Sequence, residues 1–333
     1  MEIPGVQQLF FQDLKKKLAG HVSLADDVAD VLGISTDSAY RRIRGEKQMS
    51  FEEIGKMCSH YKISLDSFLN IPTDSFIFSG KLKEKSETSF DDFLDFMLQN
   101  FQFFNTFSRK HLYILMKDIP AFVHFHIPEL AAFKFHFWMK SILYYENMKT
   151  SKFHFNDPAF EQYHIKSKKI LEAYLNTPTT EIWNIESLNS TLRQINFYHE
   201  SGYFENTEDV KILYQKVTDL INHLEKQAEY GKIFHIGQEP RSNSPEFRMF
   251  VNELILGDNT FLAELDDMRV SFLNHSVIYF IATKDERFNY AIYQNLQNLI
   301  KKSTMISMTG EKERVRFFNK LRDKVQQRLS SVN

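Results

Sequence analysis

Residues 23–45 read SLADDVADVLGISTDSAYRRIRG and carry the signals of two short helices joined by a tight turn. Ser23 and Asp26 have the spacing of a capping box, which predicts the start of the first helix. Gly33 can adopt the left-handed backbone conformation that ends a helix. Ser35 can then cap the second helix. These signals predict a helix-turn-helix.

Apolar side chains in the same stretch have the spacing of a buried face. Val28 and Leu32 lie one turn apart on the first helix and are expected to point inward. Ala29 is small, which suits a position where a second helix crosses closely. On the second helix, Ala39 and Ile43 share a face and can pack against the first.

The opposite side of the second helix carries polar and aromatic side chains. Ser50 and Glu53 form a further capping box, which predicts a third helix with Met57 on its inner face. The side chains on the second helix and just beyond it include long donors suited to base edges and phosphates of DNA. The candidate DNA-binding residues are Ser35, Thr36, Asp37, Tyr40, Arg41, Arg42, Arg44 and Lys47.

At these residues the sequence resembles the Xre/lambda-repressor-like helix-turn-helix families, and its run DSAYRRIRGE at 37–46 looks closest to a BetR-type domain. Ala29 and Gly33 fit that pattern, whereas Arg42 stands where many members have an apolar residue. The resemblance covers about a fifth of the chain. It implies a bacterial transcriptional regulator. Runs at 118–120, 128–134 and 310–314 also resemble the C-terminal part of such regulators.

Changes in composition predict two domains. We assign residues 1–70 to the helix-turn-helix DNA-binding domain and 90–333 to a regulatory or dimerisation domain. The segment 71–89 contains a proline, a glycine and the charged run KLKEK, and it is predicted to be a linker.

The larger domain is predicted to be mostly helical. Short runs separated by turn residues, at 247–256, 260–265 and 270–274, indicate a small antiparallel β-meander. Two helices are expected to follow, near 285–302 and 311–329. The predicted fold class is therefore mainly α: an N-terminal helix-turn-helix bundle and a larger α-helical domain with a small meander near the C-terminus.

Composition restricts the class of protein. A net charge of -2 argues against coating nucleic acid through bulk charge, although it permits a basic surface on one helix. The one cysteine, Cys58, cannot form an internal disulfide, which suits a cytoplasmic protein. The N-terminal run lacks the apolar core of a signal peptide. Charged residues interrupt the apolar stretch 119–145, so no membrane association is expected.

Other candidate sites are weaker. The histidines between residues 111 and 136 lack acidic or cysteine partners at ligand spacing, so packed or surface histidines are favoured over a metal site. Glu129 and Lys134 could pair beside a pocket, but roles on a helix surface are favoured. No P-loop, dinucleotide-binding turn or nucleophile elbow is found. We therefore predict no cofactor and no enzymatic activity.

Together these patterns predict a sequence-specific DNA-binding transcriptional regulator that acts as a homodimer. Its larger domain would sense a small-molecule or peptide effector, or would dimerise. The 32 phenylalanines are expected to fill a core, with an apolar pocket or a dimer interface as alternatives. The apolar stripe of the last helix would pack within its own domain or contribute to the dimer. In the alternative function, the helix-turn-helix binds a protein or peptide and does not read DNA.

Overall fold

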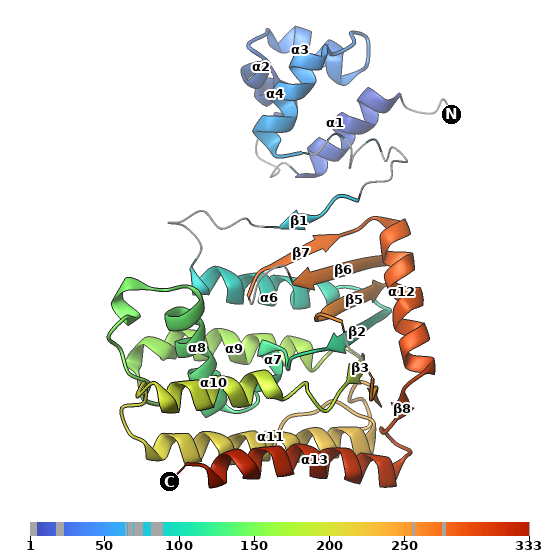
Figure 1. The fold of residues 1–333 in the computed structure, drawn as a ribbon. Helices are drawn as coiled ribbons and strands as arrows, with labels where there is room; N and C mark the ends of the chain where they lie inside the picture. The colour runs from blue at the N-terminus through green and yellow to red at the C-terminus, as the bar shows by residue number, and fades with distance from the viewer. Residues whose placement is uncertain are drawn as a thin grey trace. The chain divides into compact units, whose positions relative to one another are not determined.

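The computed structural model of the protein describes residues 5–17, 23–63, 65, 69, 76–80, 89–254, 257–274 and 278–332. Contacts divide the chain into unit 1 (Met1–Ile77) and unit 2 (Phe78–Asn333), which Figure 1 draws and which we treat separately. The division falls within the segment 71–89. Of that segment, residues 71–75 and 81–88 lie outside the described residues.

Unit 1 is made of short helices around a small apolar core. Its helices in the described residues are α1 (Val6–Lys17), α2 (Leu24–Leu32), α3 (Thr36–Ile43) and α4 (Phe51–Tyr61). Helix α2 packs against α3 and α4, while α1 packs against α3. Of the inward positions that the sequence predicts, Val28, Leu32, Ala39 and Met57 are buried, whereas Ile43 is half-buried.

Unit 2 is built on one mixed β-sheet. Its strands in the described residues are β1 (Ser79–Gly80), β2 (Lys110–Met116), β3 (Thr179–Trp183), β4 (Phe247–Val251), β5 (Thr260–Leu265), β6 (Met268–Asn274), β7 (Phe280–Thr283) and β8 (Thr304–Met305). They lie in the order β1-β7-β6-β5-β2-β3-β4-β8. Strands β2, β3 and β4 are parallel to one another, whereas the other neighbours are antiparallel.

Helices cover both faces of this sheet. They are α6 (Phe90–Phe104), α7 (Ala121–His124), α8 (Pro128–Phe137), α9 (Glu161–Tyr174), α10 (Asn189–Glu200), α11 (Glu208–Tyr230), α12 (Glu286–Lys301) and α13 (Glu311–Ser330), with the short helices η1 (Trp138–Ile142), η2 (Glu146–Met148) and η3 (Pro158–Phe160). Helix α12 contacts β5 and β6, and the remaining helices form the main core on the other side (Figure 1).

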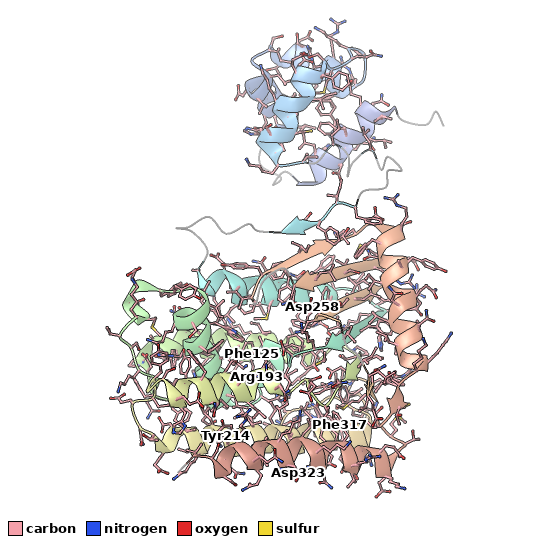
Figure 2. All side chains as sticks on the ribbon, in the orientation of Figure 1. Phe125, Arg193, Tyr214, Asp258, Phe317 and Asp323 are labelled. Carbon is pink, nitrogen blue, oxygen red and sulfur yellow. The ribbon has the colours of Figure 1, made fainter. Side chains whose placement is uncertain are left out.

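The two faces can be traced along β2, because successive side chains of a strand point to opposite sides. Ile114 and Met116 join the main core. Leu115 instead packs in the smaller cluster beneath α12, together with Leu296 of that helix. Figure 2 shows the side chains that fill the main core, where the labelled Phe125 is buried.

The prediction of a mainly α fold is wrong, since the large mixed sheet makes unit 2 an α/β domain. Strands β2 and β3 were missed because strands buried on both faces lack the alternation that marks a half-exposed strand. Strand β3 also reads TTEIW, and all of its residues are buried, including Glu181. Because this central strand begins with polar residues, its sequence does not indicate a buried strand.

The predicted meander contains the wrong strands. Residues 247–251 form β4, which pairs with β3 and β8 and not with β5. The antiparallel meander is β5-β6-β7, with β1 at its edge. Gly80, which we assigned to the linker, belongs to β1. Pairing between distant strands decides these positions, and local turn signals do not report it.

Local signals mark the starts of two helices in unit 2. Ser89 and Asp92 form a capping box before α6, and Pro128 is the first residue of α8. The capping box at Ser23 is wrong, because its side chain makes no cap hydrogen bond, although α2 does begin at the next residue.

The last helix, α13, packs against α11 within unit 2. Phe318, Leu321 and Val325 are buried there, whereas Val315 is exposed. The interpretation that this apolar stripe packs in its own domain therefore fits the structure. None of the helices in the described residues has both the length and the apolar character needed to cross a membrane.

Candidate nucleic-acid interface

Helix α2 passes into α3 through three residues. Gly33 has a φ of 66°, in the left-handed region that favours glycine. Its N–H donates to the Asp30 carbonyl at 3.3 Å. The N–H of Ile34 donates to the Ala29 carbonyl at 3.0 Å, which completes a Schellman closure of α2. The predicted turn is confirmed, and it is held by local backbone bonds.

The first turn of α3 is tied to its own cap and to α2. The Ser35 hydroxyl accepts from the Ser38 N–H at 3.3 Å, as the sequence predicts. The Thr36 hydroxyl donates to Asp26 Oδ1 at 3.2 Å. These bonds position the start of α3, while Ser35 and Thr36 stay exposed.

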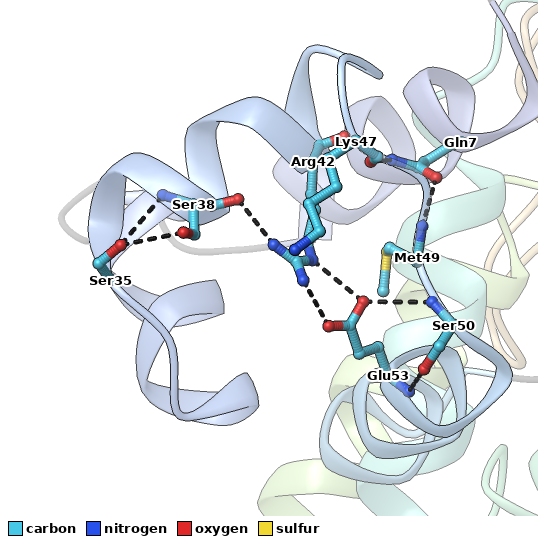
Figure 3. Close-up of polar contacts among 8 residues, drawn as sticks. All are labelled: Gln7, Ser35, Ser38, Arg42, Lys47, Met49, Ser50 and Glu53. Atoms are coloured by element: carbon cyan, nitrogen blue, oxygen red, sulfur yellow. Dashed lines mark hydrogen bonds and ion pairs between the residues drawn. The ribbon is translucent and has the colours of Figure 1, made fainter.

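The inner side of α3 is fixed by Ala39 and Arg42, of which Arg42 is only 4% exposed. Arg42 donates to both carboxylate oxygens of Glu53, from Nε at 3.0 Å and from Nη2 at 2.6 Å (Figure 3). Its Nη1 donates to the Ser38 carbonyl at 3.1 Å. Arg42 holds the pKa of Glu53 below its ordinary value, because hydrogen bonds to the carboxylate favour its charged form.

The prediction that Arg42 contacts DNA is therefore wrong. Its guanidinium is buried between α3 and α4 and is occupied by Glu53 and a backbone carbonyl. Glu53 also belongs to the predicted capping box with Ser50, which is confirmed. One carboxylate thus joins the start of α4 to the inner side of α3.

Helix α1 holds the loop that follows α3. Gln7 Nε2 donates to the Arg42 carbonyl at 2.7 Å and to the Lys47 carbonyl at 2.8 Å (Figure 3). Its Oε1 accepts from the Met49 N–H at 3.0 Å. The sequence analysis missed Gln7 because its partners lie 35 to 42 residues away, beyond any local pattern.

The outer side of α3 and the following loop present the remaining candidates to solvent. Tyr40 is 46% exposed, and the side chains of Arg41 and Arg44 are 54% and 55% exposed. Spacings of four residues put Thr36, Tyr40 and Arg44 on one face of the helix. All the other candidates are exposed, namely Ser35, Thr36, Asp37, Tyr40, Arg41, Arg44 and Lys47.

Glu46 partly neutralises this surface. Arg44 donates to its two carboxylate oxygens at 2.6 and 3.1 Å, and Arg41 lies 3.9 Å from it. The hydrogen bond from Arg44 lowers the pKa of Glu46, and the same contact raises the pKa of Arg44. Glu46 stands in the run that we singled out, yet its role as a counter-charge was not predicted. A DNA phosphate at this point would compete with Glu46.

Among the weaker candidate sites, Glu129 and Lys134 are arranged differently from the sequence-based expectations. In the described part of the chain, no group of three or more His, Cys, Asp or Glu side chains is placed to hold a metal ion. The predicted alternative of a Glu129–Lys134 pair is wrong, since Glu129 pairs with Lys216 at 3.2 Å. The favoured surface role is wrong for Lys134, which is buried and donates to Thr191.

A comparison with models of protein families finds none that matches this chain, and a comparison with curated proteins finds no match either. The resemblance to helix-turn-helix regulators therefore rests on the residues of α2, α3 and the turn between them.

Proposed function

We propose that this protein binds double-stranded DNA through α3 and regulates transcription. One observation carries the proposal. Helix α3 packs Ala39 and Arg42 against the rest of unit 1, whereas its Thr36, Tyr40 and Arg41 side chains are exposed. A short exposed helix held against another by a tight turn is the arrangement with which helix-turn-helix proteins enter the major groove.

The outward side chains then have distinct roles. Arg41 and Arg44 have the planar donor groups that pair with the O6 and N7 atoms of guanine. Thr36 and Tyr40 lie along the same helix and would contact base edges or position it. Lys47, in the loop after α3, would contact phosphate. Because Glu46 already binds Arg44, DNA has to displace it, which lowers the affinity most at low salt.

Unit 2 would supply effector sensing or dimerisation. Two copies of the chain would place their α3 helices on half-sites roughly 34–36 Å apart. The apolar face of α13 is used against α11, so another surface of the chain would join the copies. The proposal locates the protein in the bacterial cytoplasm and assigns it no enzymatic reaction and no cofactor.

The direct test is to select binding sites from random double-stranded DNA with the purified full-length protein. A salt concentration of about 150 mM would suppress non-specific contacts. We expect an enriched inverted repeat, because two symmetric copies read the same half-site in opposite directions. The matched control is Arg41→Met, which should lose the enrichment while its unfolding curve stays unchanged.

Absence of any enriched sequence, also at about 50 mM salt, would overturn the proposal. Equal enrichment by Arg41→Met would overturn the role given to α3. In either case the exposed side of α3 would be better explained as a surface that binds a protein or peptide.

A further inference from the structure

Unit 2 contains a cavity of about 470 Å³ between α6, α8, α10 and the sheet. This is within the roughly 300–1,000 Å³ of small-molecule sites. Aromatic rings line it from several elements: Phe96, Phe101, Phe137, Trp138, Phe261 and Phe280. Such walls favour an apolar ligand, because its burial removes apolar surface from water.

One cation is buried in this apolar wall. Lys134, on α8, is 4% exposed. Its Nζ donates to Thr191 Oγ1 at 3.0 Å and to Gln194 Oε1 at 2.6 Å, both on α10. An ammonium group has three N–H donors. In the part of the chain that the structure describes, no carboxylate oxygen lies within 4.0 Å of Lys134 Nζ, the limit for an ion pair. The ammonium group therefore has no ion-pair partner there.

The neighbouring hydrogen bonds fix the direction in which Lys134 donates. His124 Nδ1 lies 3.1 Å from the Pro120 carbonyl, which can only accept, so Nδ1 carries the ring proton. His124 Nε2 is then an acceptor, and it takes the Thr191 hydroxyl proton at 3.0 Å. The Thr191 oxygen is left to accept from Lys134. This chain of bonds holds Nζ at the cavity wall.

The other charged groups of the cavity are Lys117, Asp118 and Asp258. Lys117 and Asp258, the latter labelled in Figure 2, form an ion pair with each other, and both are exposed. Asp118 favours the charged form of Lys134, but burial outweighs it and lowers the pKa of Lys134 to about 7. Burial and the nearby Lys134 keep the pKa of His124 well below its ordinary value.

We infer that this cavity binds a small hydrophobic monocarboxylate, whose carboxylate accepts a hydrogen bond from Lys134 Nζ and whose tail lies between the aromatic rings. The carboxylate supplies the ion-pair partner that Lys134 lacks among the described residues. This inference names the effector class for unit 2 and to that extent rests on the proposed function. Binding itself is measured without DNA, so the two can fail separately.

The test is a calorimetric titration of the full-length protein with decanoate, and with decanol and decylamine as neutral and cationic analogues. We expect decanoate to bind more tightly than decanol by about tenfold, the scale of one hydrogen bond to a charged group. Decylamine should bind most weakly, because its charge would approach that of Lys134.

Two variants locate the carboxylate. Lys134→Met keeps the length of the side chain, and it should lower the affinity for decanoate about tenfold while leaving that for decanol unchanged. Lys211→Met is the matched control, because Lys211 forms an exposed ion pair with Glu208 and does not line the cavity, and it should leave both affinities unchanged. Equal binding of decanoate and decanol, no binding of decanoate, or a greater loss in Lys211→Met than in Lys134→Met would each overturn the inference.

The pH dependence gives an independent readout. A bound carboxylate raises the pKa of Lys134, so decanoate binding takes up a proton above the free-state pKa of about 7. The affinity should fall as the pH rises from 7 to 9, and this dependence should be absent in Lys134→Met. Unchanged wild-type affinity across that range would contradict a role for Lys134. Failure here leaves DNA selection by unit 1 untouched.

Discussion

Arg42 in unit 1 and Lys134 in unit 2 are both buried cations, and their charges are met in opposite ways. Both residues are 4% exposed. Arg42 meets a carboxylate with two hydrogen bonds, whereas Lys134 meets a hydroxyl and an amide oxygen, both neutral. Arg42 thus has an ion-pair partner, whereas Lys134 has none among the residues that the structure describes.

The comparison shows that a buried charge with an ion-pair partner can join two helices, whereas one without a partner beside a cavity indicates a binding site. The planar guanidinium of Arg42 matches the carboxylate of Glu53 and joins two helices. The ammonium of Lys134 keeps a charge at the wall of a cavity, where desolvation disfavours it. A charge left without a counter-ion beside an empty space indicates that the counter-ion comes from a ligand.

The largest expected effect is on the stability of unit 1. Arg42→Met should destabilise it by about 3 kcal/mol, because Glu53 would lose its partner while partly buried. The measurement is denaturant unfolding of the full chain, with hydrogen exchange in α3 and α4 to assign the loss. Arg41→Met on the same helix is the control and should unfold like wild type. Equal destabilisation by the two variants would show that the buried Arg42 contributes no more to stability than the exposed Arg41.

The same pair predicts a pH dependence in unit 1. The pKa of Glu53 is lowered on folding, so its contribution is present above the ordinary glutamate pKa of 4.5. It is lost as the pH falls through the lowered value of the folded state. Acid unfolding of unit 1 should therefore begin at higher pH in Arg42→Met, because the protection of Glu53 is absent. The amide exchange of α4 between pH 3 and 6 measures it.

A smaller effect of opposite sign is expected in unit 2. Lys134→Met should raise its free energy of unfolding by about 2 kcal/mol at pH 7, because relief of the buried charge exceeds the two lost hydrogen bonds.

The gain should also depend on pH. From pH 7 to 10.5 the unfolded chain holds a proton on Lys134 that the folded wild type has released, so wild-type stability rises with pH. The advantage of Lys134→Met should shrink over that range. Thermal unfolding at several pH values measures this, and a variant that is less stable at pH 7 would contradict it.

Arg41 is exposed and is not expected to affect stability, but we expect it to contribute to the binding of DNA. Arg41→Met should weaken specific binding by about 1–3 kcal/mol, the scale of a lost base contact. Fluorescence anisotropy with the selected site measures this, and a scrambled site of the same length is the control. An equal loss on both sites would assign Arg41 to phosphate contact and not to base reading.

The smallest effect is expected at the counter-charge of this surface. Glu46→Gln removes the carboxylate that binds Arg44, so DNA no longer has to displace it. Affinity should rise by up to about threefold at low salt, and the gain should vanish at high salt, as for exposed ion pairs. A decrease in affinity would show that Glu46 orients Arg44 for DNA.

The sequence by itself determined the features that depend on near neighbours. Gly33 permits the left-handed turn, Ser35 caps α3 three residues on, and Ser50 with Glu53 caps α4. Each involves residues within one helical turn, so the local pattern contains all the atoms that matter. The existence of the helix-turn-helix and of its exposed side could therefore be predicted.

Only the tertiary structure decided the features that depend on distant partners. The direction of Arg42 follows from Glu53 on another helix, and the sheet of unit 2 follows from pairing between strands such as β3 and β4, 64 or more residues apart in the chain. Lys134 stands in an apolar run whose residues are buried all round the helix, so no periodicity marks its side. Whether a buried charge is neutralised is set by what packs against it, and that is a property of the folded chain.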